Sequence, residues 1–279
     1  MKSILLGKYI DRLASLNDQL CFFQFNKNEL DKRLIEFGPN AGKLYTPDVF
    51  AQNSMAPRIN VKISELSSFQ NLNQTFTFGA YFSTSYEVVS NYIEDSIKLL
   101  NTINPTTFQL TIDSMLEEKY RLTLASSNCS AVPIELIQTL KYIRLRRNHF
   151  THLSDQLTPV FSSLIISEGN NLNSFWASVI KKLDFKNLDV LKFEEEETIE
   201  LLKILRIIVQ RLDENLGNNL SHRGIAAFLS SREFNKPQRI NIDIINKRIS
   251  KIRTLGKLDF GITLTDAIIE PLVKTIGVK

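Results

Sequence analysis

Residues 134–152 read Ile-Glu-Leu-Ile-Gln-Thr-Leu-Lys-Tyr-Ile-Arg-Leu-Arg-Arg-Asn-His-Phe-Thr-His, and this stretch decides the fold class. Its apolar residues recur at three- and four-residue spacing, which predicts an α-helix with one apolar stripe. Pro133 opens the helix well, because the N–H group that proline lacks would have no partner in a first turn. Arg147 continues the stripe, so we expect this face to be pressed against another surface. The stripe itself consists of Leu136, Leu140 and Ile143.

The same spacing runs through most of the 279-residue chain, in which only ten Gly and eight Pro occur. We therefore predict an all-α fold. Between residues 38 and 82 the pattern breaks up around three prolines and Gly79, so we expect an irregular connection there. The expected helices cover residues 3–24 with a continuation to 35, and then 85–103, 107–125, 134–152, 160–166, 172–183, 198–216, 223–231 and 243–253.

These patterns divide the chain into three parts. Residues 1–83 hold N-terminal helices and an irregular insertion, residues 84–217 form a helical core around the segment 134–152, and residues 218–279 form a basic helical extension. The last part contains eleven Lys and Arg against five Asp and Glu, whereas the whole chain carries a net charge of only +4. Such a local excess suits phosphate binding, because neutralising phosphates releases counterions. The expected nucleic-acid-binding residues of this tail are Lys247, Arg248, Lys251 and Arg253.

The composition excludes several protein classes. With 43% hydrophobic and 23% charged residues the chain is neither disordered nor collagen-like. No apolar run approaches the roughly 18 residues of a membrane span, and the first residues do not form a signal peptide, so we expect a cytoplasmic protein without a membrane partner. Two cysteines, Cys21 and Cys129, are too few for a disulfide framework.

Two of the three histidines lie in the segment 134–152, and Arg147-Asn148 precedes His152 in an R-N-x-x-x-H string. This string resembles the R-x(4–6)-H signature of the HEPN superfamily, helical domains of which many are metal-independent ribonucleases. The resemblance implies a HEPN-like helical bundle, an endoribonuclease acting on RNA without a metal or another cofactor, and products with 2′,3′-cyclic phosphate and 5′-hydroxyl ends. It also suggests a toxin or antiviral-defence effector with a protein inhibitor or antitoxin. Toxin members carry a Tyr two positions after the histidine, where this chain has Ser154.

The residue types suit this chemistry. Histidine titrates near neutrality, so His152 is the candidate for moving protons between the 2′-hydroxyl and the leaving 5′-oxygen. A guanidinium presents two fixed donors to two phosphate oxygens, which makes Arg147 the candidate for stabilising the transition state. Asn148 lies one helical turn before His152, on the same face, so its amide could orient the imidazole or a phosphate.

Arg147 and His152 do not share a face of an unbroken helix. At 100° per residue they lie about 140° apart around the axis, so they cannot simply pair within one chain. HEPN ribonucleases are generally dimers in which the motif helices meet. The resemblance therefore implies a homodimer in which Arg147 of one copy approaches His152 of the other.

Several alternatives remain open at this level. Arg144 precedes His149 by the same interval, and Arg146 precedes His152 by one residue more, so Arg144, Arg146 and His149 are secondary candidates for catalysis or RNA binding. The Arg run could equally be a solvated last helical turn. His149 and His152 lack further ligands for a metal. A non-catalytic nucleic-acid-binding regulator or scaffold is the alternative function.

Other conspicuous features have plainer interpretations. The segment Gly38–Leu44 does not fit a phosphate-binding loop, because its glycine spacing is wrong and no Ser or Thr follows the lysine. The run Glu194–Glu197 is expected at the start of a helix, where it meets the positive end of the dipole. Trp176 and most of the eighteen Phe are expected in the core, whereas Phe150 could pack or stack on a base.

Overall fold

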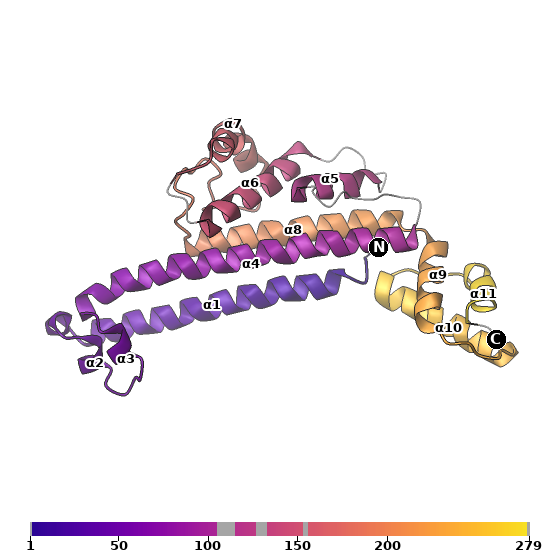
Figure 1. Ribbon diagram of the computed structural model, residues 1–279, viewed down its shortest axis with the longest axis horizontal. Helices are drawn as coiled ribbons and strands as arrows, with labels where there is room; N and C mark the ends of the chain where they lie inside the picture. The colour runs from indigo at the N-terminus through magenta and orange to yellow at the C-terminus, as the bar shows by residue number, and fades with distance from the viewer. Residues whose placement is uncertain (1, 105–114, 127–132, 153–155, 278–279) are drawn as a thin grey trace.

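The protein is built from α-helices (Figure 1). The computed structural model describes residues 2–104, 115–126, 133–152 and 156–277. In these residues there is no β-strand, and an isolated antiparallel bridge joins Tyr45 to Lys62. The predicted all-α class is confirmed. In order, the helices are α1 (Leu6–Glu36), α2 (Thr46–Val49), α3 (Ala56–Ile59), α4 (Leu66–Ile103), α5 (Leu116–Ser126), α6 (Ile134–Thr151), α7 (Pro159–Trp176), α8 (Glu195–Asn219), α9 (His222–Glu233), α10 (Ile242–Phe260) and α11 (Asp266–Val273), with 3₁₀ turns at Pro39–Lys43 and Ile63–Glu65.

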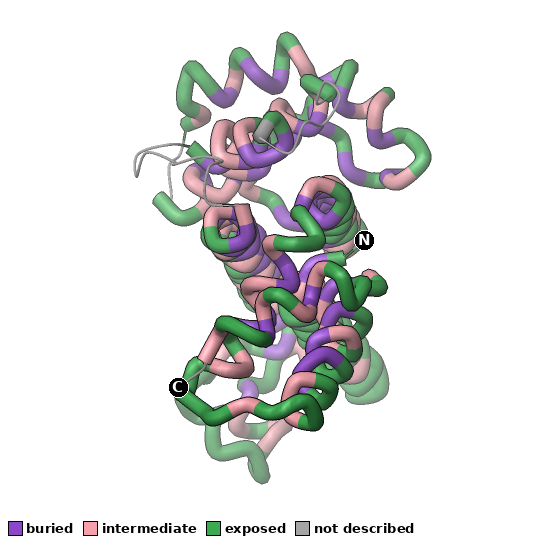
Figure 2. Tube along the Cα trace, turned by 90° about the vertical axis from the view of Figure 1, so that its right-hand side faces the viewer, coloured by how far each residue is buried: buried purple, intermediate pink, exposed green. Residues whose placement is uncertain are grey.

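Three long helices, α1, α4 and α8, lie side by side along the long axis of the molecule (Figure 1). Their facing sides are apolar at helical spacing, and burying such a stripe is the main stabilisation of a helix in a protein. In Figure 2 the buried residues follow the sides on which the helices meet. The buried residues of this core include Tyr9, Leu13 and Leu20 of α1, Phe78, Phe82, Val89 and Ile93 of α4, and Leu201, Leu205, Ile208 and Leu212 of α8.

A second layer, α5 to α7, covers one side of α4 and α8 (Figure 1). Helix α6 contacts α4, α5 and α7, so it lies at the centre of this layer. Its residues Leu136, Leu140 and Ile143 are all buried, as the stripe predicts. The surface against which this face presses therefore belongs to the same chain.

The predicted irregular connection is wrong for residues 66–82, which form the first half of the continuous helix α4. Residues 38–65 do lack long helices and hold only single turns. Gly79 does not interrupt the helix. It lets the ring of Phe150 in α6 approach the α4 backbone, in space that a Cβ at position 79 would occupy. Tertiary packing thus overrides the low helix propensity of a segment rich in Asn, Ser, Thr and Phe.

Helices α9, α10 and α11 pack on one another at the end of α4 and α8, away from α2 and α3 (Figure 1). Gly224 of α9 comes so close to the carbonyl of Ile103 that a Cβ would overlap it. The predicted boundary at residue 217 therefore lies near the end of α8, whereas the boundary at residue 83 lies within α4.

Some expectations fall partly outside the described residues. The helix expected over 107–125 is described as α5 from Leu116 onward, and Cys129 and Ser154 are not among the described residues. Of the helices that are described, none has the length and apolar character needed to cross a bilayer.

Candidate functional site

Helix α6 runs from Ile134 to Thr151, with Pro133 as its N-cap and His152 as its C-cap. Both ends agree with the prediction to within one residue. The helical geometry continues into His152, whose backbone N–H donates to the carbonyl of Asn148 at 3.0 Å. One side of α6 is buried. The opposite side carries the partly or fully exposed residues Ile134, Gln138, Lys141, Leu145, Asn148 and His152.

Arg147 lies at the edge of the buried side, where α6 crosses α4. Its Nη2 donates to Oε1 of Glu87 at 2.6 Å, and its guanidinium lies 5.7 Å from the centre of the Tyr86 ring. Its Nη1 donates to the side-chain oxygen of Asn148 at 3.2 Å. Nε is buried and has no hydrogen-bond partner in the part of the chain that the structure describes. The side chain is 30% exposed, and the groups left for an anion are the second N–H of Nη1 and that of Nη2, since Nε is buried.

Asn148 therefore orients the guanidinium. The sequence suggested an imidazole or a phosphate as its partner, but the oxygen of the amide is taken by Arg147. His152 is exposed at the end of the helix, and among the described residues its side chain has no hydrogen-bond partner. Arg147 and His152 point from different sides of α6, as the 100° rotation per residue requires. The structure does not bring these two side chains together within one chain.

Arg144, a secondary candidate, is occupied by α5. Its Nε and Nη2 both donate to the carboxylate of Glu117, with a closest distance of 2.6 Å. The side chains of both partners are less than one fifth exposed. Arg144 therefore ties α6 to α5 and offers little to a substrate.

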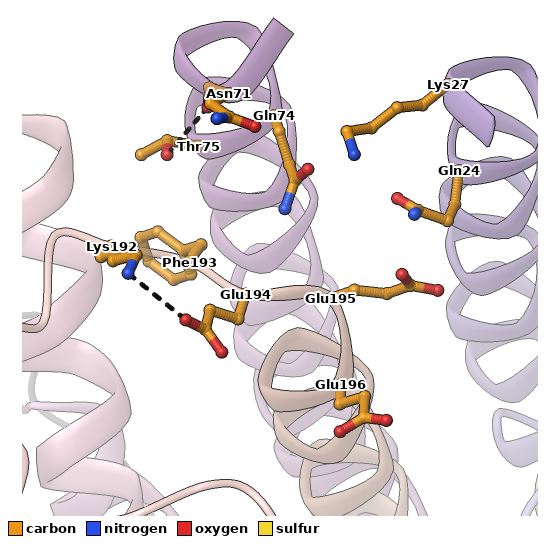
Figure 3. A pocket seen from close by; sticks show the side chains of 10 residues that line it. All are labelled: Gln24, Lys27, Asn71, Gln74, Thr75, Lys192, Phe193, Glu194, Glu195 and Glu196. Atoms are coloured by element: carbon orange, nitrogen blue, oxygen red, sulfur yellow. Dashed lines mark hydrogen bonds and ion pairs between the residues drawn. The ribbon is translucent and has the colours of Figure 1, made fainter. Parts of the chain in front are cut away.

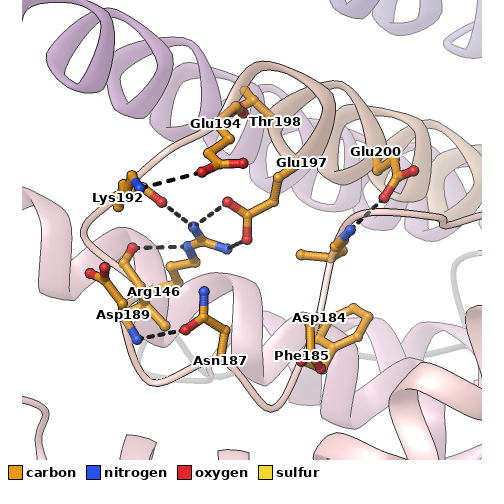
Figure 4. A network of polar contacts seen from close by, with 12 residues as sticks. Arg146, Asp184, Phe185, Asn187, Asp189, Lys192, Glu194, Glu197, Thr198 and Glu200 are labelled. Carbon is orange, nitrogen blue, oxygen red and sulfur yellow. Dashed lines mark hydrogen bonds and ion pairs between the residues drawn. The ribbon is translucent and has the colours of Figure 1, made fainter. Parts of the chain in front are cut away.

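Arg146 is buried, with 1% of its surface exposed, and this burial excludes direct contact with RNA (Figure 4). Its two terminal nitrogens bind both oxygens of Glu197 in α8, at 2.7 and 3.0 Å. Nε and Nη2 donate to the backbone carbonyls of Val190 and Lys192, and the guanidinium lies 4.5 Å from the centre of the Phe193 ring. The secondary role proposed for Arg146 in catalysis or RNA binding is thus replaced by a structural one.

Our sequence analysis did not predict this ion pair, although the sequence contains a signal for it. Glu197 lies in the first turn of α8 and was interpreted only as a charge at the helix dipole. That interpretation of residues 194–197 is confirmed for the position of the helix start, with Glu194 as N-cap. Glu197, however, also continues the apolar stripe Leu201–Leu205–Ile208 at a spacing of four, four and three residues. A carboxylate in an apolar stripe indicates a buried partner.

Two side chains near this ion pair, those of Glu200 and Arg146, hold the connection between α7 and α8 in place. Glu200 accepts hydrogen bonds from the backbone N–H groups of Lys181, Lys182 and Leu183, at 2.7 to 3.2 Å. Arg146 holds the other end of the connection, near residues 190–192 (Figure 4). Glu200 of α8 thus holds one end of this irregular segment, and Arg146 of α6 holds the other.

His149 is also buried, with 6% exposed, and it faces Phe161 of α7 at 6.4 Å between ring centres. Burial lowers the pKa of its imidazole from the ordinary value of 6.5. Its Nδ1 has no hydrogen-bond partner among the described residues. His149 is therefore a neutral interior side chain. No group of three or more potential metal-ligating side chains occurs in the described parts of the chain.

Phe150 packs and does not present a free face. Its ring lies above Gly79 and packs against the rings of Phe193 and Phe76, with 5.4 and 6.3 Å between the ring centres. Trp176 is a core residue, as predicted, and its indole N–H donates to the hydroxyl of Thr139 at 2.8 Å.

A polar pocket of about 480 Å³ lies between α1, α4 and the start of α8 (Figure 3). None of the predicted site residues lines it. Amide, hydroxyl and carboxylate groups surround it, together with Lys27. The other lining residues are Gln24, Asn71, Gln74, Thr75, Lys192, Phe193, Glu194, Glu195 and Glu196.

The four predicted cations of the tail differ in their surroundings. Arg248 is 4% exposed and donates to the carbonyls of Val273 and Ile276 at 3.1 and 2.8 Å. It is therefore not an RNA-binding residue in this fold. Lys251 pairs with Glu233, and Arg253 pairs with Asp266. Lys247 is exposed and has no ion pair within the described residues.

Comparison with known protein families, curated proteins and solved structures finds no match for this chain.

Proposed function

We propose that this protein is a metal-independent endoribonuclease of the HEPN type, which cleaves RNA by attack of the 2′-hydroxyl on the scissile phosphate. The observation that carries the proposal is the string Arg147-Asn148-xxx-His152 at the C-terminal end of the central helix α6, where His152 is exposed and Arg147 is accessible and oriented. The all-helical fold around this helix is compatible with the family.

The roles follow from the chemistry of the side chains. His152 moves the proton from the 2′-hydroxyl or to the leaving 5′-oxygen, because an imidazole can both accept and donate a proton. Arg147 stabilises the charge that develops on the non-bridging oxygens. Asn148 and Glu87 position the guanidinium of Arg147 by accepting hydrogen bonds from two of its nitrogens.

The working site is a composite of two copies of the chain. Arg147 and His152 lie on different sides of α6, and a neighbouring α6 is the simplest source of the missing group. The outer side of α6 that includes Lys141, Asn148 and His152 is partly or fully exposed, so it can meet a second copy. The apolar stripe of α6 cannot form the dimer interface, because it is buried against other helices of the same chain.

The first experiment is RNA cleavage by the wild type and by His152→Ala and Arg147→Ala, in excess chelator, with the product ends identified. We expect both variants to be inactive and the wild type to leave 2′,3′-cyclic phosphate ends. His222→Ala is the matched control, since His222 is exposed in the first turn of α9 and should be dispensable. Activity that survives in His152→Ala contradicts the proposal.

Mixing the two inactive variants tests the composite site. A mixed dimer has one site in which both Arg147 and His152 are intact, so random mixing should restore about a quarter of the wild-type activity. No recovery after mixing contradicts a site shared between copies, provided that the two variants exchange subunits.

A non-catalytic nucleic-acid-binding regulator or scaffold is the second candidate. The observation in its favour is that Arg144, Arg146 and Arg147 all have carboxylate partners within the chain. On this alternative, the wild type does not cleave RNA, and His152→Ala only weakens nucleic-acid binding or has no effect.

A toxin or defence effector, by contrast, should harm cells on expression only while His152 is present, and should be silenced by a protein inhibitor.

A further inference from the structure

The cations of residues 218–279 fall into two groups in the structure. Five have internal partners, and five are exposed without an ion pair among the described residues; the eleventh, Lys279, is not described. The partnered group is Arg232, Arg248, Lys251, Arg253 and Lys274. The unpaired group is Arg223, Lys236, Arg239, Lys247 and Lys257.

Three of the unpaired cations belong to one region. Lys236 and Arg239 lie in the segment that connects α9 to α10, and Lys247 lies in the second turn of α10. Asn241 caps α10 by accepting a hydrogen bond from the N–H of Ile244 at 2.9 Å, so the positive end of that helix lies in the same region.

Buried Arg248 holds this region in place. Its guanidinium bonds to the carbonyls of Val273, Ile276 and Gly277 and lies 4.5 Å from the centre of the Phe234 ring. The N–H of Gln238 donates to the carbonyl of Gly277 at 3.0 Å. The connecting segment is therefore attached to α10 and to the end of the chain, and its lysine and arginine are carried by an ordered backbone.

Most carboxylates of residues 218–279 are paired with cations of the same part of the chain. Glu233 pairs with Arg232 and Lys251, and Asp259 also pairs with Arg232. Asp243 in the first turn of α10 has no ion pair among the described residues and is a single negative charge beside three positive ones. A net positive surface results.

We infer that Lys236, Arg239 and Lys247 form a binding surface for the phosphodiester backbone of a nucleic acid. Unpaired, solvent-exposed cations release counterions when they meet successive phosphates, and this release drives binding without sequence preference. The surface replaces the set expected from the sequence, of which only Lys247 remains. The inference does not depend on ribonuclease activity.

The surface lies well away from Arg147. From Glu87, the partner of Arg147, α4 continues for sixteen residues to Ile103, which contacts Gly224 at the start of the basic part. At 1.5 Å per residue this is about 24 Å. An RNA strand held at the basic surface could therefore extend toward the motif helix, and RNA binding and cleavage should be separable by mutation.

The test compares two triple variants that lose the same charge, both in the His152→Ala background so that RNA stays intact. One is Lys236→Ala/Arg239→Ala/Lys247→Ala, and the other is Lys251→Ala/Arg253→Ala/Lys274→Ala. Binding of a labelled single-stranded RNA of mixed sequence, and of a DNA strand of the same sequence, is measured by fluorescence anisotropy over a range of salt concentrations. Thermal melting verifies that both variants are folded.

We expect the first triple variant to bind at least about tenfold more weakly and to lower the salt slope by about two, which is the loss of three contacts to a single strand. The second should bind nearly as the wild type does, because its cations are already neutralised within the protein. Asp243→Asn should strengthen binding. Inorganic phosphate should compete no better than chloride at equal ionic strength.

Three outcomes overturn the inference. Equal losses in the two triple variants would mean that only total charge matters. Unchanged binding in the first variant would place the nucleic acid elsewhere. Displacement by phosphate beyond its ionic-strength effect would indicate a small-anion site. If the first triple variant does not fold, the single variants Arg239→Ala and Lys247→Ala carry the same test, each with an expected slope change of about 0.7.

Discussion

Arg146 and Arg147 are adjacent in the chain, yet one is buried and the other reaches solvent. Arg146 binds a carboxylate 51 positions away in the sequence, and Arg147 binds one 60 positions away. The difference comes from the 100° rotation between successive helical residues, which directs Arg146 to α8 and Arg147 to the edge of α4. A single residue step thus separates a structural cation from a candidate functional one.

Loss of Arg146 should destabilise the protein. Arg146→Ala leaves Glu197 buried without its partner, and removing one member of a buried ion pair costs about 3–5 kcal/mol in the free energy of unfolding. Urea denaturation measures this difference. Arg121→Ala, which breaks an exposed pair with Glu118, is the control and should leave the free energy of unfolding nearly unchanged, because solvent screens such a pair. An equally small effect of Arg146→Ala would refute the structural role.

His149 should make the stability depend on pH. Because burial lowers the pKa of its imidazole in the folded protein, the unfolded chain binds a proton more readily. The stabilisation is present above the unfolded pKa of about 6.5 and is lost as the pH falls below it. The melting temperature should therefore decrease from pH 7 to pH 5, and less steeply in His149→Leu. His222→Ala should keep the wild-type dependence, and a His149→Leu variant with that same dependence would contradict the assignment.

At the scale of elements, α4 and α6 determine the geometry of the candidate site. They cross where Phe150 lies over Gly79, and Arg147 meets Glu87 two turns further along α4. A close crossing of this kind needs a residue without a side chain. The glycine that looked like a helix breaker in the sequence is therefore what allows the two helices to approach.

Gly79→Ala should disturb this crossing. The added methyl overlaps the Phe150 ring, so we expect a loss of about 1–3 kcal/mol in the free energy of unfolding. Gly7→Ala in α1 is the control, because nothing lies within 4 Å of its Cβ position and alanine favours a helix. Adding Phe150→Leu should restore part of the stability lost in Gly79→Ala. A neutral Gly79→Ala would mean that the helices cross at a greater distance.

At the scale of the whole molecule, the long three-helix core separates two regions with different chemistry. The motif helix lies against its side, and the basic unit of α9 to α11 lies at its end (Figure 1). On the proposed function, one region would bind a nucleic acid while the other acts on it. It also leaves the outer side of α6 available for a second copy.

The proposed dimer should depend on that outer side. Lys141→Glu reverses a charge at a partly exposed position on the outer side of α6 and should convert a dimer to a monomer, with loss of RNA cleavage but not of RNA binding. Light scattering coupled to size-exclusion chromatography measures the mass. Ile35→Glu, at an exposed position near the end of α1, should leave the oligomeric state unchanged. A wild-type monomer, or a Lys141→Glu variant that remains a dimer, would exclude this interface.

Patterns in the amino-acid sequence were enough to predict the helical class, the limits of α6, the buried stripe of that helix and the excess of positive charge at the C-terminal end. These are local properties, since a helix needs only correctly spaced apolar residues and suitable caps. The string Arg147-Asn148-xxx-His152 is likewise visible in the sequence, and its proposed role is still a prediction.

Which cations are accessible depends on tertiary packing and could not be predicted from the sequence. Arg146 and Arg248 look like their neighbours in the sequence, but distant carboxylates and carbonyls bury them. The helical first half of α4 also depends on this packing, because Phe150 and the core compensate for its weak helix propensity. The physical reason is the same in each case. A desolvated charge or a crowded glycine is stable only beside a partner that lies far away in the sequence, and only the folded chain brings that partner near.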